Sequence, residues 1–248
     1  TTSAHYEVAK FFLQQRVHCF IEKPITTTLE EADELISVAQ DVGCVIQVGH
    51  VERFNSAVTA LSSSISAPQF IESDRIAPYQ LRATDVGVIL DLMIHDIDLI
   101  SALFNSEVVD VQASGSTIFS DHIDVANARL TFKNGGVANV TASRAGLKRE
   151  RVMRIFQRDS YTVLNLLDKS YTIHRKAGFN PETGLPEVSS VKESFSSGDA
   201  IKVELEAFAS SILDGAPVVV SGVAGRRALS IALQIKQKVK ESYVYSNG

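Results

Sequence analysis

The sequence of 248 residues contains little sulfur and no tryptophan: there are two cysteines, two methionines and no Trp. Cys19 and Cys44 both lie in apolar segments, so we expect two reduced thiols rather than a disulfide-stapled scaffold, as is usual in cytoplasmic proteins. A run of about 18 apolar residues is also missing, so we expect no membrane-spanning segment. These absences favour a cytoplasmic globular protein.

An excess of positive charge is missing as well. There are 24 Lys and Arg against 29 Asp and Glu, and the formal net charge is −5. Since nucleic-acid binding depends on clustered cations, we expect no nucleic-acid partner. The densest basic stretch, residues 144–158, mixes charges with strand-like apolar residues, and we interpret it as a solvated strand face rather than an anion site. No metal-ligand spacing and no Gly-x-Ser-x-Gly elbow occurs, so we expect neither a metal site nor a serine hydrolase.

The first 50 residues alternate between helical and strand patterns. The predicted elements are a helix over 4–15, an apolar strand over 17–21, a helix that begins with a Thr28–Glu31 capping box and ends at Gly43, and a strand over 45–48. Continuous apolar strands that alternate with helices are typical of a parallel sheet. Residues 1–50 are therefore predicted to be the C-terminal half of a Rossmann-type dinucleotide-binding domain.

The pattern changes in residues 51–248. Alternating apolar and polar residues flank Asn134-Gly135, which is the strongest short signal for a β-hairpin. We expect a helix over 85–104, an exposed loop over 178–198, and two closing helices over 199–213 and 224–241. The fold class is therefore predicted as α/β, with an α+β domain that contains a large, mainly antiparallel open sheet. This second domain would bind substrate and form oligomers.

Two groups of polar residues follow the two predicted parallel strands, where ligands bind in open α/β sheets. Glu22-Lys23-Pro24 follows the first strand, and a desolvated lysine there could polarise or deprotonate a substrate hydroxyl. The alternative is a charged pair that ends a strand. His50 and Arg53 follow the second strand as candidate substrate-binding residues. Their alternative is a hinge whose polar groups pair with each other.

Asp91 and His95 lie four residues apart on the predicted helix over 85–104. Residues at this spacing are neighbours on one helix face, so the carboxylate could orient the imidazole as a general base. In the alternative interpretation, Asp91 is a helix cap and His95 is a surface residue. The density of ionisable groups in this stretch favours a catalytic role.

The ordered combination of Glu22-Lys23-Pro24, VGHVERFN at 48–55 and DLMIHDIDL at 91–99 resembles the Gfo/Idh/MocA family, named after glucose–fructose oxidoreductase, inositol dehydrogenase and a rhizopine-catabolism protein. This resemblance implies an NAD(P)-dependent oxidoreductase that acts on a sugar or nucleotide sugar. It also implies that Lys23 is the catalytic lysine, that Glu22, Lys23 and Pro24 shape the nicotinamide end of the cofactor site, and that Asp91 and His95 form the family's D-x-x-x-H pair. The branch that it resembles most is that of the nucleotide-sugar 3-dehydrogenases.

The same resemblance implies that the family's first strands and Gly-rich phosphate loop precede Thr1, where no initiator Met stands. We therefore expect these 248 residues to be about the last three-quarters of an enzyme and to be inactive by themselves. A non-catalytic sugar-binding or scaffold protein on the same fold is the alternative. A homo-oligomer formed through the free face of the open sheet is expected in either case. The substrate, the choice between NAD and NADP, and which of Lys23 and His95 is the base stay open.

Overall fold

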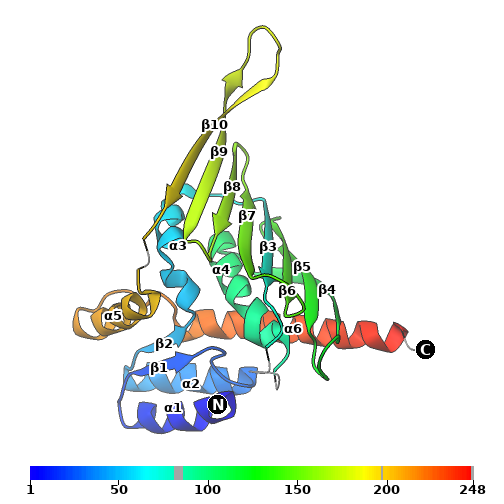
Figure 1. Ribbon diagram of the computed structural model, residues 1–248. Coiled ribbons are helices and arrows are strands. Elements are labelled where there is room, and N and C mark those ends of the chain that lie inside the picture. Colours follow the sequence, from blue (N-terminus) through cyan, green and yellow to red (C-terminus); the bar gives the residue numbers. More distant parts are fainter. Residues whose placement is uncertain (81–85, 197, 247–248) are drawn as a thin grey trace.

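The computed structural model describes residues 1–80, 86–196 and 198–246. A small parallel sheet with helices forms one part of the molecule, and a large sheet with helices on one face forms the other (Figure 1). Helix α6, at Gly222–Ser246, runs between them and contacts β2, α2, α4 and β4. This long helix is the main element shared by both parts.

The first part is a helix–strand repeat. Its elements are η1 at Thr2–Ala4, α1 at His5–Gln14, β1 at Cys19–Glu22, α2 at Leu29–Val42 and β2 at Ile46–Gly49. Strands β1 and β2 are parallel and in register from Cys19↔Ile46 to Glu22↔Gly49, so their carboxyl ends lie side by side. The predicted capping box is present, because the Thr28 hydroxyl accepts from the Glu31 N–H and the Glu31 carboxylate accepts from the Thr28 N–H.

The second part contains an eight-stranded sheet. Its strands are β3 at Phe70–Ile76, β4 at Val108–Ser116, β5 at Val125–Phe132, β6 at Val137–Ser143, β7 at Glu150–Phe156, β8 at Ser160–Asn165, β9 at Ser170–Phe179 and β10 at Pro186–Ser194. The order is β10-β9-β8-β7-β3-β6-β5-β4, and every pairing is antiparallel except that of β3 with β6. The carboxyl ends of β3 and β6 therefore meet the amino end of β7 at one edge of the sheet.

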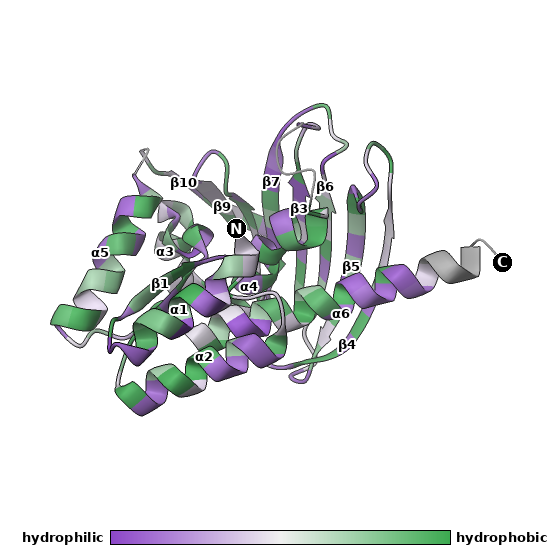
Figure 2. Ribbon diagram, turned by 90° about the horizontal axis from the view of Figure 1, so that it is seen from below, coloured by the Kyte–Doolittle hydropathy of each residue, from purple (hydrophilic) through white to green (hydrophobic). Residues whose placement is uncertain are grey.

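One face of this sheet is covered by helices and the other is free (Figure 2). The covering elements are η2 at Val51–Phe54, α3 at Ser56–Leu61, η3 at Ser62–Ser64, the π-helical turn η4 at Ile89–Met93 and α4 at Ile94–Phe104, together with α6. Alternation decides the faces: on β5, Leu130 and Phe132 are buried in the core, whereas Asn127 and Arg129 are exposed. A row of rings crosses the free face from Phe156 through Tyr161 to His174.

Helix α5 at Ala200–Leu213 packs near the first part, where Phe208 makes an edge-to-face contact with Phe20 of β1. Asp199 caps its start by accepting from the Ile201 and Lys202 N–H groups. The first part thus has its own apolar core, separate from the core under the large sheet. The predicted fold class is confirmed, and the division of the chain at residue 50 stays a prediction.

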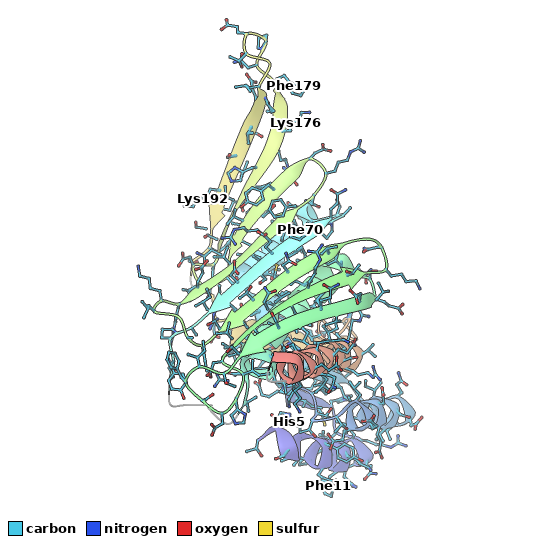
Figure 3. All side chains as sticks on the ribbon, turned by 90° about the vertical axis from the view of Figure 1, so that its right-hand side faces the viewer. His5, Phe11, Phe70, Lys176, Phe179 and Lys192 are labelled. Carbon is cyan, nitrogen blue, oxygen red and sulfur yellow. The ribbon has the colours of Figure 1, made fainter. Side chains whose placement is uncertain are left out.

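Two predicted elements differ from the structure. The segment predicted as an exposed loop over residues 178–198 is exposed, but the absence of a strand is wrong, because β9 and β10 form a long hairpin whose tip projects away from the helices (Figure 3). Residue 197 of that range lies outside the described residues. Every residue of β10 is exposed, so this strand has no buried face to produce a strong alternation signal. The helix predicted over 85–104 begins with the π-helical turn at Ile89–Met93, and Asp85 lies outside the described residues.

In the described part of the chain, no helix is long and apolar enough to cross a membrane.

Candidate active site

The candidate site lies where the carboxyl ends of β1 and β2 meet the first turns of η4 and α4. Lys23, which directly follows β1, donates to the Asp91 backbone carbonyl at 2.7 Å, and its Nζ lies 3.5 Å from the Asp91 carboxylate. The Lys23 side chain is 18% exposed. This contact brings together two predicted catalytic residues that are 68 positions apart in the sequence.

His50 and His95 form the second half of the site. Their ring centroids lie 6.3 Å apart in an edge-to-face arrangement, with His50 following β2 and His95 on α4. His50 is 1% exposed. Within the described residues, neither ring nitrogen of His50 nor the Nδ1 atom of His95 has a hydrogen-bond partner. Buried polar atoms are nearly always hydrogen-bonded in proteins, so these three nitrogens are exceptions. His50 is fully buried, whereas the His95 ring as a whole is partly exposed.

The electrostatic environment keeps both imidazoles neutral. Burial lowers the pKa of His50 below its usual value, against the opposing carboxylate of Asp98. Burial also lowers the pKa of His95, and the positive charges of Lys23, Arg75 and Arg151 lower it further. A neutral imidazole can accept a proton at physiological pH, as a general base must.

Lys23 is shifted in the same direction. Burial lowers the pKa of its ammonium group, whereas the Asp91 carboxylate acts in the opposite sense. A lysine with a lowered pKa can donate a hydrogen bond to a reacting oxygen and can also exchange its proton. Lys23 and His95 are thus both suited to proton transfer in one small region.

Asp91 and His95 are not hydrogen-bonded to each other in the described structure; the Asp91 carboxylate faces Lys23 instead. The physical reason is the π-helical turn at Ile89–Met93, which contains Asp91. In a π-turn the hydrogen bonds span five residues, so the four-residue spacing of an α-helix no longer aligns two side chains. Asp91 therefore contacts Lys23, and within the described residues no hydrogen bond joins it to His95.

Arg53 lies in an internal ion pair. Its Nε and Nη2 donate to the Asp98 carboxylate at 2.6 Å and 3.0 Å, and the Asp98 side chain is 2% exposed. Arg53 is thus paired with another polar side chain, as the alternative interpretation of this segment as a hinge predicts. Its partner, however, comes from α4 and not from the segment itself. Its role in substrate binding stays a proposal.

The sequence analysis missed a buried ion network beside the site. Arg75 of β3 donates to Asp96 at 2.6 Å and 3.0 Å and to Glu52 at 2.9 Å. Arg151 of β7 donates to the same Glu52 oxygen at 3.1 Å. A usable signal was the register of β3, where Ile71 and Ser73 face inward and Arg75 therefore must do so too.

A second set of buried polar groups lies behind Glu22, where α5 covers β1 and β2. Gln47 donates from its side chain to the Glu204 backbone carbonyl at 2.9 Å. Burial and the nearby Glu22 carboxylate raise the pKa of the Glu204 side chain to about 7. Gly49 lets Glu22 lie close to β2, since a Cβ atom there would stand 2.9 Å from a Glu22 carboxylate oxygen.

The residues at this edge fit the nicotinamide end of a dinucleotide. Parallel strands present their carboxyl ends there, and Glu22 is an exposed acceptor beside Lys23 and Pro24. Hydroxyl groups of a ribose are donors that such a carboxylate can bind. No group of three or more His, Cys, Asp or Glu side chains among the described residues could hold a metal ion.

Comparisons with known families match both parts of the chain. Residues 1–50 match the family described as oxidoreductase family, NAD-binding Rossmann fold. Residues 57–163 match the GFO/IDH/MocA C-terminal domain.

Similar proteins extend the match over nearly the whole chain. UDP-N-acetylglucosamine 3-dehydrogenase from Acidithiobacillus ferrooxidans is 42% identical over 241 residues, which are 96% of this chain and 76% of that protein. A solved structure of that enzyme superposes with a TM-score of 0.91 at 39% identity, over 97% of this chain and 77% of the other. Myo-inositol 2-dehydrogenase from Thermotoga maritima is 25% identical over 258 residues, covering 97% of this chain and 76% of that protein.

The raised pKa of Glu204 predicts a pH-dependent stability. Its value is about 7 in the folded protein against an ordinary 4.5, so folding favours the protonated form. This contribution is fully present below pH ~4.5 and is lost as the pH rises through about 7, a change of about 3 kcal/mol. Glu204→Gln stays neutral and should flatten the dependence of the free energy of unfolding on pH in that window.

Urea unfolding of wild type and variants between pH 5 and 8 measures this effect. Glu206→Gln is the matched control, because Glu206 lies on the same helix and is exposed. An unchanged pH dependence in Glu204→Gln would show that the Glu204 carboxyl is ionised normally in the folded protein.

Proposed function

Because the chain belongs to the Gfo/Idh/MocA family of oxidoreductases, we propose that it transfers a hydride between a nicotinamide cofactor and a hydroxyl group of a nucleotide sugar. The family and its NAD-binding Rossmann fold agree with the resemblance seen in the sequence. The observation that carries the proposed function is the junction of Lys23, Asp91, His50 and His95 between the two parts of the molecule.

The proposed substrate class rests on the relative at 42% identity, whose name states that it oxidises UDP-N-acetylglucosamine at carbon 3. The cyclitol dehydrogenase from Thermotoga maritima is less similar, at 25% identity. We therefore take UDP-N-acetylglucosamine as the first substrate to test and free inositol as the comparison compound.

In the oxidation direction, the substrate loses a hydroxyl proton and a hydride from the same carbon, and a ketone forms. His95 accepts the proton, since its imidazole is neutral and its ring is partly exposed. Lys23 donates a hydrogen bond to the reacting oxygen and stabilises the negative charge that develops there. Asp91 holds the Lys23 ammonium group in place. The bound nicotinamide supplies the acceptor for the hydride.

Three further residues have supporting roles in this proposal. Glu22 binds a hydroxyl group of the cofactor ribose, and Pro24 shapes the same edge. His50 packs edge-to-face against His95 and supports its ring. A homo-oligomer formed through the free sheet face stays a proposal, supported by the aromatic row on that face.

Lys23→Met tests the proposed mechanism. The variant removes the ammonium group but keeps an unbranched side chain, and we expect turnover of UDP-N-acetylglucosamine with NAD⁺ to fall about 10²- to 10⁴-fold in the complete protein. Absorbance of the reduced nicotinamide at saturating substrate measures this rate. Lys10→Met is the control, because Lys10 pairs with Glu34 on the helical face of the first part.

Wild-type turnover in Lys23→Met would contradict this assignment. A non-catalytic sugar-binding protein predicts instead that UDP-N-acetylglucosamine binds without any reduction of NAD⁺ and that Asp91→Asn is without effect. Turnover of inositol alone would replace the nucleotide sugar by a cyclitol as the substrate class.

The 248 residues contain no Gly-x-Gly-x-x-Gly sequence, the loop on which the pyrophosphate of a dinucleotide rests. We therefore propose that these residues by themselves bind NAD weakly and do not turn over substrate. Titration calorimetry of the 248-residue chain with NAD⁺ should give no saturable heat at micromolar ligand. A micromolar dissociation constant would show that the residues present suffice for binding.

A further inference from the structure

No hydrogen bond from the His95 side chain fixes the position of its imidazole ring in the described structure. Within the described residues Nδ1 makes no hydrogen bond, and the expected carboxylate of Asp91 is directed at Lys23. The ring contacts His50, whose two ring nitrogens also make no hydrogen bond within the described residues. The backbone of the first turn of α4 must therefore decide where the imidazole lies.

That first turn is anchored at the next residue. Asp96 is 1% exposed and accepts two hydrogen bonds from the Arg75 guanidinium, at 2.6 Å and 3.0 Å. Such a two-point pair fixes orientation as well as distance. The turn before it is a π-turn, an irregular helix geometry that needs support from its surroundings. The Arg75–Asp96 pair supplies that support.

Arg75 also contacts the segment that directly follows the first part of the molecule. Its Nη1 donates to Glu52, which lies in η2 directly after β2 and His50. Glu52 is held further by Arg151, and its other oxygen accepts from Asn55 at 3.3 Å. One guanidinium therefore joins β3, α4 and the segment that carries His50.

A buried ion network is a poor source of stability, since removing charges from water can outweigh their attraction. The Arg75 and Asp96 side chains are 3% and 1% exposed, so nearly all of this cost applies. A specific geometry is the better explanation of such a network. We propose, on the basis of the proposed function, that Arg75 is a positioning residue that holds His95 against the substrate hydroxyl through Asp96 and Glu52.

The charge of Arg75 adds a second effect on the same residue. The titratable groups around His95 come from several elements: Lys23 after β1, His50 and Glu52 after β2, Arg75 on β3, Asp91 in η4, Arg151 on β7, and Asp96 on its own helix. The carboxylates are paired with Lys23, Arg75 and Arg151. After burial and Lys23, Arg75 is the next cause that lowers the pKa of His95.

Two substitutions separate geometry from charge. Arg75→Lys keeps the charge but loses the planar fork, so we expect kcat to fall about 10- to 100-fold with little change in KM or in the pH profile. Arg75→Gln removes the charge as well. The pKa of His95 should then rise, and the acid limb of the kcat/KM profile should move to higher pH, because more of the imidazole is protonated at a given pH.

Arg154→Lys is the matched control. Arg154 lies on β7 and pairs with Asp74 at 2.9 Å on the free face of the sheet, away from His95. It should keep the wild-type kcat and pH profile. If Arg75→Lys loses only thermal stability and keeps the wild-type kcat per folded molecule, the positioning role is refuted.

Asp96→Asn covers the case in which the Arg75 variants do not fold, since an amide of the same size still accepts from Arg75. We expect it to fold and to lose kcat, and a folded Asp96→Asn with wild-type kcat would also refute the role. Nuclear magnetic resonance of the His95 ring, assigned with His95→Gln, needs no activity. The His95 signals should shift or double in Asp96→Asn and stay unchanged in Arg154→Lys.

These measurements distinguish the two proposals. If the His95 signals shift in Asp96→Asn but the wild-type protein is inactive, the positioning role of Arg75 is supported and the proposed reaction is rejected. Unchanged His95 signals in Asp96→Asn, with an active wild type that depends on Lys23, would reject the positioning role alone.

Discussion

The buried contact of Arg75 with Asp96 and Glu52 is the constraint on which the arrangement of this molecule depends. It joins β3 of the large sheet to α4 and to the segment that follows β2 of the small sheet. The remaining elements surround this junction: α6 packs on both parts, and the capped helix α2 supports the strands that end there. A network of this kind contributes little net stability, so its value lies in the single geometry that it selects.

That geometry places groups of complementary chemistry at one sheet edge. Lys23 comes from the first part and Asp91 from the second, and their contact closes the junction on one side. His50 and His95 close the other side as two neutral imidazoles with unpartnered nitrogens in the described structure. Burial is the first cause of the lowered pKa of all three basic groups, and the neighbouring cations reinforce it for His95. A basic side chain and two imidazoles thereby lie close together in a largely buried, low-dielectric environment.

Much of this could be predicted from local sequence signals. The Thr28–Glu31 capping box and the Asn134-Gly135 hairpin are short-range patterns whose geometry depends on few neighbours, and both are present. The family and the fold class were also predictable, because the order of three motifs carries more information than any one of them. The features that were not predicted correctly depend on tertiary packing. The solvated strand β10 has no buried face, the π-turn moved Asp91 toward Lys23, and only the register of β3 turned Arg75 inward.

We propose that a hydride leaves the carbon whose hydroxyl proton is taken at this site. The most direct measurement uses the complete protein with NAD⁺ and UDP-N-acetylglucosamine that carries deuterium on carbon 3 of the sugar. We expect the deuterium to be recovered on the reduced nicotinamide and the product to be the 3-keto sugar nucleotide. Deuterium that stays in the sugar, or that exchanges into water without reduced cofactor, would contradict it.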